Sequence, residues 1–532
     1  MADQTSQSAS EPAATDLAAM AAATPDTRDR YVDFLRGFSI LVVVFGHWLI
    51  AVVVWREGEI EGFNALERID GLWALTWLLQ VMPLFFFVGG FSNLRSHRAS
   101  TKKGQGYAGF IHGRLVRMMR PTIVFLGVGL VVVTILDAAN VADSVVFPVS
   151  ELIARPLWFL GVYMIVVALA PLMLRLHDRF GLAVPAAMAA AAIVIDIVRL
   201  GLDVGGVGYA NYPLVWLLTH QLGFVYADGD LLLRARWWLA GTGLAALIAL
   251  VQLGPYPGSM VGLSTDEFSN MDPPTIAIAA LTIWQIGLAM ILRRPVSRWL
   301  ARTRPWTGVI FVNSVIMTVF LWHLTAMVIG IGILFPLGFP QPDAGSAQWW
   351  LLRPVWVALL IVVLAVFVIL FGRFEARTGR TPTLSTPPGR VAGGISALGV
   401  AMTVLGVLGF AMGGLHQLFS LTGTELIIFN LNPLQNVIHL LLGGALVAAA
   451  LRPRTLFLAA SAACVVLLTL GVAGVFMVSN PDVNHLAANH ADNVLHFGAA
   501  AIALVLAGAD RRRDRVTRAP AARPDAQGAS RR

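Results

Sequence analysis

The sequence predicts an all-α protein that crosses a membrane many times. Of its 532 residues, 57% are hydrophobic and only 13% are charged. An average soluble domain is about 45–50% apolar and about 25% charged. The mean hydropathy is +0.73. The single cysteine, Cys464, excludes a disulfide scaffold and a thiolate zinc cluster, and no residue is assigned to a metal.

The predicted elements are fourteen helical spans, each an apolar run close to the roughly 20 residues that cross a bilayer. The run at 212–227 is the weakest because it is short and polar. In chain order the runs lie near 38–55, 72–92, 121–137, 156–174, 183–199, 212–227, 237–253, 275–292, 308–335, 349–371, 393–414, 434–451, 455–478 and 494–509.

Lysine and arginine are divided unevenly between the alternate loops that join these spans. One set of loops holds 33 of the 38 basic residues and the other set holds 5. Because positively charged loops stay in the cytoplasm, both termini are predicted to be cytoplasmic. The net charge of +8 then reflects topology and contact with anionic headgroups, and no nucleic-acid partner is expected.

A polar, proline-rich stretch separates the first ten spans from the last four. We therefore expect five parts. They are a disordered tail over 1–27, a ten-helix membrane domain over 28–372, a cytoplasmic linker over 373–392, a four-helix domain over 393–510 and a basic disordered tail over 511–532.

The four-helix part contains an internal repeat of a two-helix hairpin. The motif NPLQNVIH at 432–439 parallels NHADNVLH at 489–496, with a constant offset of 57 residues. In each copy an Asn and a His stand three residues apart on one helix face: Asn436 with His439, and Asn493 with His496. The motif indicates either a small polar or ion site or hydrogen bonds that join the helices, and we favour the second.

Titratable residues inside a span are costly and indicate function. Arg36 and His47 are eleven residues apart on the first span, so they share a helix face and His47 lies roughly 16 Å deeper. A desolvated histidine is neutral and can take a proton from a hydroxyl group. For either residue alone, an anchoring arginine or a histidine that only bonds a neighbouring helix is an equal alternative.

A second group of basic residues lies before the third span. Arg114 and Arg117 are three residues apart, and Arg120 follows just before Pro121. Because a guanidinium group matches the shape of a phosphate, a cofactor with several phosphates, such as coenzyme A, could dock here. Anchoring of the span by its positive charge is the alternative.

Five motifs follow one another along residues 28–378. They are Arg36 with His47, MPLFFFVGGF at 82–91, Arg114 with Arg117, PLWFL at 156–160, and FLWH at 320–323. In this order they resemble the motifs of the acyltransferase-3 family of membrane O-acyltransferases, in which Ser-Gly is usual where MPLFFFVGGF has Val-Gly and a Tyr-x-x-His segment is similar to FLWH. The last four spans resemble a four-helix membrane domain of unassigned function that carries paired Asn-x-x-His motifs.

The resemblance implies an O-acyltransferase of the plasma or inner membrane. It would move an acyl group, acetyl or longer, from acyl-coenzyme A to a hydroxyl of a cell-envelope glycan, lipid or related acceptor. His47 would activate the hydroxyl or briefly carry the acyl group, Arg36 would orient the donor, and Arg114, Arg117 and Arg120 would bind it. No permanently bound cofactor is expected, and the expected partners are membrane lipid, acyl-coenzyme A and the acceptor.

We expect an acceptor cavity at His220 and Gln221 of the polar sixth span, together with His323 and Trp158. The sixth span could equally be a re-entrant segment packed inside protein. The alternative function is a transporter or flippase of a lipid-linked or amphipathic substrate. An inverted repeat would favour transport, but the repeat that we find is parallel and confined to the last four spans.

Reporter fusions test the predicted orientation. Fusions after residue 65, within 262–270 and within 482–490 should all report the outside, because the loops of the opposite set hold most of the Lys and Arg. A cytoplasmic signal at 262–270 would mean that the spans between the second and the seventh were miscounted, with 212–227 as the first suspect.

Overall fold

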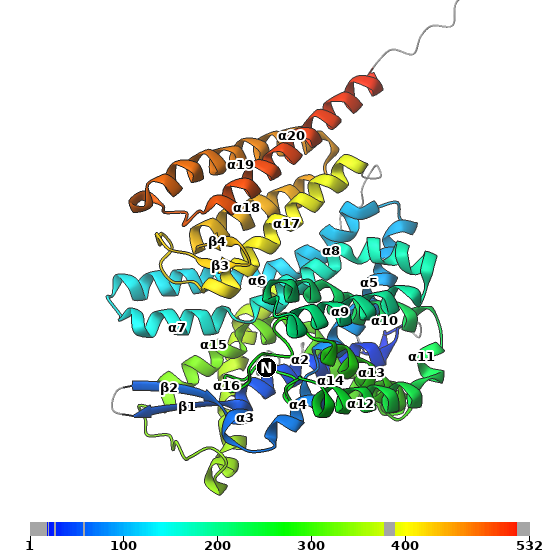
Figure 1. Ribbon diagram of the computed structural model, residues 1–532, viewed down its shortest axis with the longest axis vertical. Helices are drawn as coiled ribbons and strands as arrows, with labels where there is room; N and C mark the ends of the chain where they lie inside the picture. The colour runs from blue at the N-terminus through cyan, green and yellow to red at the C-terminus, as the bar shows by residue number, and fades with distance from the viewer. Residues whose placement is uncertain (1–18, 20, 26–27, 57–58, 377–388, 519–532) are drawn as a thin grey trace, which may run out of the picture. The chain divides into compact units, whose positions relative to one another are not determined.

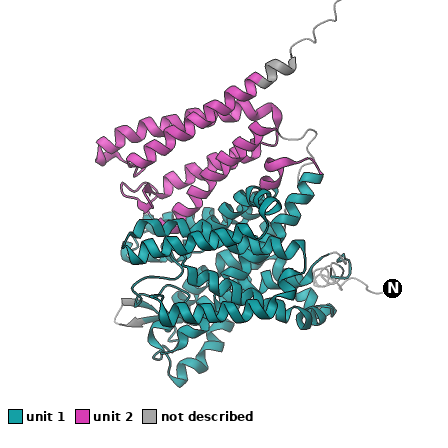
Figure 2. Cartoon of the chain, turned by 45° about the vertical axis from the view of Figure 1, so that its right-hand side comes forward, with its two compact units in different colours: residues 1–102, 113–380, 414–416 teal, residues 103–112, 381–413, 417–532 magenta. Residues whose placement is uncertain are grey.

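The computed structural model describes residues 19, 21–25, 28–56, 59–376 and 389–518. The chain forms two compact units (Figure 2), which we describe separately. Unit 1 comprises residues 1–102, 113–380 and 414–416, and unit 2 comprises residues 103–112, 381–413 and 417–532. The change of unit at 380/381 falls within the predicted linker 373–392, of which 377–388 lie outside the described residues.

Unit 1 is a helical bundle with one β-hairpin (Figure 1). The elements of unit 1 are α2 (Arg30–Ile50), β1 (Ala51–Arg56), β2 (Glu59–Asn64), α3 (Ala65–Arg68), η1 (Leu72–Ala74), α4 (Leu75–Leu79), α5 (Met82–Lys102), α6 (Gly106–Ala138), α7 (Asp143–Ala154), α8 (Leu157–Phe180), α9 (Ala183–Asp196), η2 (Ile197–Gly201), η3 (Gly205–Ala210), α10 (Asn211–Asp228), α11 (Leu231–Arg234), α12 (Arg236–Leu253), α13 (Ile276–Leu300), α14 (Thr303–Ser314), α15 (Ile316–Leu334) and α16 (Ala347–Ala376). The first residues of α6, up to His112, are counted with unit 2.

Unit 2 consists of two helical hairpins, α17 with α18 and α19 with α20 (Figure 1). Small residues form much of its core, including Ala463, Ala499 and Ala503, which lets the helices approach closely. Its elements are α17 (Arg390–Gly413), β3 (Thr424–Leu426), β4 (Phe429–Leu431), α18 (Pro433–Ala449), η4 (Pro453–Thr455), α19 (Leu456–Ser479), η5 (Pro481–Val483) and α20 (His490–Arg518).

Helices lie at all fourteen places where the sequence predicts spans. Among the described residues, 12 helical segments are long and apolar enough to cross a membrane. The two predicted spans outside that set are α10, which is polar, and α18, which has only 17 residues. The all-α, multi-pass architecture is confirmed, whereas the count of fourteen and the orientation of the termini stay predictions.

The first span differs from its predicted range of 38–55. Helix α2 ends at Ile50, and Ala51 begins β1, which pairs antiparallel with β2 from Ala51↔Asn64 to Arg56↔Glu59. Consecutive valines at 52–54 favour a strand because branching at Cβ suits a pleated backbone. His47 therefore lies in the last turn of α2, nearer to the end of the helix than the sequence predicts.

Both predicted disordered tails contain ordered residues. Within 1–27, Ala21 is buried against Leu300 and Trp306, and the Trp306 indole donates to the Thr24 hydroxyl at 2.9 Å. An alanine-rich segment can dock this way because an aromatic surface is available to it. At the other end, α20 continues through Arg518 into the predicted tail 511–532, since arginine is a good helix former and extending a helix costs less than starting one.

Helix α10 packs against four helices of unit 1, namely α5, α8, α9 and α13. It crosses α5 at a pair of glycines. A Cβ added to Gly90 would lie 2.0 Å from the carbonyl oxygen of His220, and one added to Gly223 would lie 2.1 Å from that of Phe87. Both positions therefore require glycine, and the close crossing fixes the height of α10 relative to α5.

Replacing Gly223 by Ala should destabilise unit 1, because the new methyl group meets backbone atoms that cannot rotate away. Overpacking typically costs about 1–3 kcal/mol, and we expect the upper end of that range here. Thermal unfolding in detergent measures the effect. The matched control is Gly241→Ala on α12, where an added Cβ meets nothing within 4 Å. Equal melting temperatures for the two variants would contradict the packing argument.

Candidate active site

His47 and His323 face each other between α2 and α15. His47 Nδ1 lies 3.0 Å from His323 Nε2, and the two ring centroids are 5.1 Å apart. The indole of Trp48, which is fully buried, donates to the His323 carbonyl oxygen at 2.9 Å. His47 and Trp48 of α2 thus both bond His323 of α15, and the two bonds fix the position of one imidazole ring relative to the other.

The hydrogen-bond partners assign the tautomers of both rings. His323 Nδ1 lies 2.6 Å from the Phe320 carbonyl oxygen, which can only accept, so Nδ1 carries the hydrogen. In a neutral ring, His323 Nε2 is then an acceptor, and His47 Nδ1 must donate to it. His47 Nε2 therefore has no hydrogen and presents a lone pair that can accept a proton.

A cavity of about 350 Å³ lies beside this pair, and both histidines line it. His47 is exposed to this space, whereas His323 is fully buried behind it. Most of the lining is apolar. It comes from α2, α3, η1, α4, the start of α5, the α7–α8 junction, α15, the start of α16 and the loop 254–275. The site is concave, partly open and built from a few polar groups in an apolar wall, as small-molecule sites usually are.

The loop 254–275, which lines part of the cavity, is tied to α3. The backbone N–H and the hydroxyl of Ser264 both donate to Glu67 Oε1, at 2.7 and 2.9 Å. Burial raises the pKa of the nearby Asp266 carboxyl, and the Glu67 carboxylate raises it further. The two hydrogen bonds of Ser264 hold this loop against α3.

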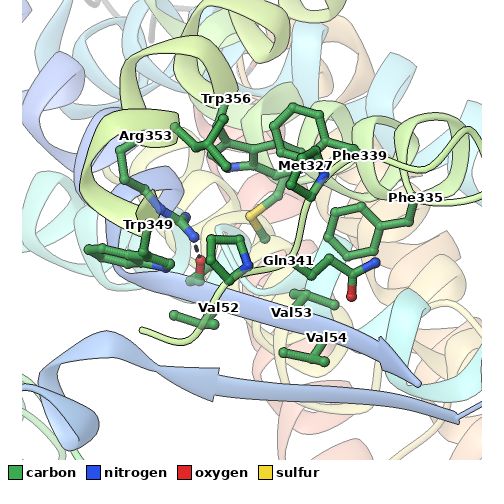
Figure 3. A pocket seen from close by; sticks show the side chains of 14 residues that line it. Val52, Val53, Val54, Met327, Phe335, Phe339, Gln341, Trp349, Arg353 and Trp356 are labelled. Carbon is green, nitrogen blue, oxygen red and sulfur yellow. Dashed lines mark hydrogen bonds between the residues drawn. The ribbon is translucent and has the colours of Figure 1, made fainter. Parts of the chain in front are cut away.

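A second, smaller pocket lies next to the cavity, and Trp349 lines both (Figure 3). Strand β1 forms one wall of it, and Arg353 donates to the Ala51 carbonyl oxygen at 3.2 Å while stacking on the Trp349 ring. Its volume of about 30 Å³ has room for little more than water. This pocket therefore fixes the cavity wall and is too small for a substrate.

Arg36 and Arg114 meet at one residue of α5, Ser92. Arg36 Nη2 donates to the Ser92 hydroxyl at 2.7 Å, and Arg114 Nη2 donates to the Ser92 carbonyl oxygen at 2.6 Å. Asp33 accepts from Arg36 at 3.1 Å. Arg114 Nε is buried and makes no hydrogen bond. Two guanidinium groups from separate helices thus converge at the start of α2, about 16 Å along the helix from His47.

The other predicted donor-binding arginines lie differently. Arg117 and Arg120 are exposed, whereas Arg114 is only partly exposed. The sequence predicted that Arg114 and Arg117 act together on one helix face. In the structure only Arg114 contacts Ser92, and Arg117 and Arg120 are exposed. Ser92 and the pairing of Arg36 with Arg114 were missed, because the two arginines are 78 residues apart in the sequence.

His220 and Gln221 do not line the cavity that holds His47, which differs from the sequence expectation, whereas His323 and Trp158 do line it. His220 Nε2 lies 3.1 Å from Asn93 Nδ2 of α5, and Gln221 Nε2 donates to the Met173 carbonyl oxygen at 2.9 Å. His220 and Gln221 of α10 therefore contact neighbouring helices inside the protein.

Arg155 is a lining residue that sequence reasoning missed. It lies at the junction of α7 and α8 and shares the cavity with His47 and Trp158. The available signal was its position directly before the PLWFL motif, in a loop set that holds only 5 basic residues. Its guanidinium group gives the cavity a fixed positive charge, which could stabilise an oxyanion formed beside His47.

Among the described residues, one group of three side chains has the composition of a metal site. It comprises Asp137, Asp143 and His416, whose ligand atoms lie within 4.8 Å of one another. His416 Nδ1 is 3.2 Å from Asp137 Oδ1, and His416 Nε2 is 3.5 Å from Asp143 Oδ1. Because the carboxylates approach different nitrogens of one ring, the geometry is that of a bridging pair of polar contacts, and we assign no metal to it.

In unit 2 the two repeated motifs meet. His439 Nε2 lies 3.1 Å from His496 Nε2, and both rings are fully buried. The two Asn residues pack against glycines of the partner helix in each hairpin. A Cβ at Gly409 would lie 2.0 Å from Asn436 Oδ1, and one at Gly474 would lie 2.0 Å from Asn493 Oδ1. The His439–His496 contact agrees with the helix-joining interpretation, whereas the side-chain amides of Asn436 and Asn493 are buried and make no hydrogen bond.

Comparison with known proteins identifies two regions of the chain. Residues 29–372 match the family model described as an acyltransferase domain, and this match covers more than half of the chain. Residues 394–509 match the model described as a domain of unknown function (DUF4383). No curated protein and no solved structure matches the chain.

Proposed function

The chain belongs to the acyltransferase-3 family of membrane acyltransferases, and from this premise we propose that it transfers an acyl group from acyl-coenzyme A to a hydroxyl group. The acceptor is a cell-envelope glycan, a lipid or a related molecule, and the protein resides in the plasma or inner membrane. Both resemblances found in the sequence, including the appended four-helix domain, are confirmed. Acyltransferase activity follows from the family.

The observation that carries the proposal is the position of His47 beside the cavity, with its Nδ1 3.0 Å from His323 Nε2, which leaves Nε2 as the basic nitrogen in the tautomer inferred above. His47 Nε2 takes the proton of the acceptor hydroxyl as the oxygen attacks the thioester carbonyl carbon. The C–S bond breaks, and the thiolate takes the proton back from His47 to leave as free coenzyme A. The products are an ester and a thiol. The Nδ1 hydrogen of His47 stays bonded to His323 Nε2 throughout.

His323 acts through His47 and is a positioning residue. By accepting from His47 Nδ1, it selects the tautomer with a basic Nε2 and stabilises the imidazolium that forms when the proton is taken. Its own Nδ1 is held by the Phe320 carbonyl oxygen, so its ring cannot flip. Arg155 supplies positive charge on the side of the cavity where the thioester oxygen becomes negative.

The donor's phosphates are proposed to bind where Arg36 and Arg114 converge on Ser92, with Arg117 and Arg120 providing further positive charge. A partly buried guanidinium with an unbonded Nε is prepared to bind an anion in a fixed geometry. The pantetheine arm would then run along α2 toward His47. In this arrangement the donor's phosphates lie near Arg36, toward the start of α2, and its thioester lies near His47, in the last turn of α2.

A transporter or flippase was the alternative from the sequence. Membership of the acyltransferase family favours an enzyme instead. The histidine pair beside the cavity suits group transfer, which needs a positioned base.

Replacing His47 by Ala should abolish transfer, because a general base typically contributes about 100- to 10,000-fold. The measurement is mass spectrometry of envelope glycans and lipids from a strain that lacks the gene. The wild-type protein should restore a missing acyl group, and the His47→Ala protein should not, although it inserts to the same level. Full restoration by His47→Ala would refute the mechanism.

The matched variants at His323 separate positioning from folding. His323→Phe removes the acceptor for His47 Nδ1 and should lower kcat by about 100-fold with little change in KM. His323→Gln keeps an acceptor oxygen and should recover part of the loss. Equal kcat values for Phe and Gln at this position would show that the hydrogen bond does not matter.

Replacing Arg114 by Gln should weaken coenzyme A binding by roughly ten- to a hundredfold, since a charge-assisted hydrogen bond contributes about 1.5–3 kcal/mol. Lys at this position should rescue only in part, because a point charge lacks the forked geometry. The affinity is measured in nanodiscs. Lys102→Gln, an exposed residue at the end of α5, is the control and should leave affinity unchanged. If Lys substitutes fully for Arg114, the residue only anchors the helix.

A further inference from the structure

The cavity beside His47 offers polar atoms at few points. Thr76 donates to the Trp73 carbonyl oxygen and accepts from the Met260 N–H, at 2.6 and 2.9 Å. Gln80 uses its Nε2 on the Met260 carbonyl oxygen and its Oε1 on the Met82 N–H. Both lining side chains are thus satisfied within the protein, as are both ring nitrogens of His323.

The rest of the wall is apolar or aromatic. It includes Leu49 and Ile50 of α2, three leucines of the 72–79 segment, Phe159, Phe320 and the tryptophans at 158, 349 and 350. Among the described lining residues, His47, Arg155 and the indole N–H groups of the three tryptophans remain as the polar groups available to a ligand, and Trp349 Nε1 has no partner within the protein. A sugar placed here would lose its hydration without gaining matching hydrogen bonds, which is unfavourable. The part of the substrate that fills this space is therefore hydrocarbon.

The orientation of the bound donor indicates which hydrocarbon part of the substrates fills the cavity. In the proposed function, on which this inference rests, the phosphates lie at Arg36 and Arg114 and the thioester carbon lies at His47. The acyl chain leaves the carbonyl on the side away from sulfur, so it points beyond His47, past the end of α2. Leu49, Ile50 and Leu72 line the cavity in that direction.

We propose that this cavity receives the acyl chain of the donor and that the protein transfers chains of about eight carbons or more in preference to acetyl. A water molecule occupies about 30 Å³ of liquid, and a methylene group is of similar size, so a volume of about 350 Å³ accommodates about ten such groups. An acetyl group would leave most of this apolar space unfilled. The transfer step is unchanged: the ester C–O bond forms, the C–S bond breaks, and the proton passes from hydroxyl to thiolate through His47.

The chain offers a position at which the cavity can be filled without disturbing its walls. Gly46 precedes His47 and lines the cavity, and a Cβ added there meets nothing within 4 Å. A leucine at 46 would therefore extend into the space that the acyl chain is proposed to use. It also improves the helix, because glycine is the weaker helix former.

The test measures binding of two thioether analogues, S-ethyl- and S-octyl-coenzyme A, to the full-length protein in nanodiscs. Each buried methylene contributes about 0.8 kcal/mol, or about fourfold in affinity. Six further methylenes should make the octyl analogue bind the wild type at least about a hundredfold more tightly than the ethyl analogue. Gly46→Leu should reduce that ratio at least about tenfold, and Gly46→Ala should reduce it less.

The matched control is Gly332→Leu, which adds the same side chain to an exposed position of α15 where nothing lies within 4 Å. It should leave the ratio unchanged. Equal affinities for the two analogues in the wild type would overturn the inference while leaving the proposed function intact. Loss of both affinities in the same proportion in Gly46→Leu would also overturn it, because residue 46 would then meet a part that both analogues share. Unchanged affinities for both analogues in Gly46→Leu would overturn it as well, and would leave the cavity to the acceptor.

Failure of the proposed function gives a different pattern. Neither analogue would then bind in an Arg114-dependent way, whatever its chain length. Mass spectrometry of the product gives an independent readout, because the mass added to the acceptor reports the length of the chain. An added mass of an acetyl group alone would contradict the inference.

Discussion

A polar atom buried among apolar helices is costly unless it finds a partner inside the protein, and this constraint shapes the candidate site. The hydrogen bond between His47 and His323 is its clearest result. It joins α2 to α15, and the Phe320 carbonyl oxygen behind it determines which nitrogen carries each hydrogen. The same contact that holds the helices together thereby creates a free basic nitrogen at the cavity. Packing and chemistry are consequences of one interaction.

The fold could be predicted largely from the sequence because hydropathy and charge report directly on membrane solvation. Helices lie at every predicted span, and the change of unit falls in the predicted linker. The hairpin of β1 and β2 could not be predicted, since the valines at 52–54 are as apolar as the helix before them. Hydropathy measures whether a segment avoids water and says little about whether it is helix or strand.

The candidate site could be predicted only residue by residue. His47, Arg36 and Arg114 were predicted because a charged or titratable group inside a span is conspicuous, and His323 was predicted through its motif; their roles stay predictions. Their pairing was not found, because His47 and His323 are separated by 276 residues. His220 shows the opposite error. Its polarity predicted a role at the cavity, but polarity reports only that a partner exists, and here that partner is Asn93.

The repeat in unit 2 brings equivalent residues of its two copies together. His439 bonds His496, its counterpart 57 residues later, and an Asn caps the start of the second helix of each hairpin. Residues that meet their own equivalents are what a two-fold axis produces in a homodimer. The two hairpins of unit 2 therefore resemble the two subunits of a homodimer joined in one chain. Two hairpins in one chain can differ in sequence, which identical subunits cannot. The equivalent positions Gln435 and Asp492 do differ, so only one hairpin carries an ionisable group beside its cap.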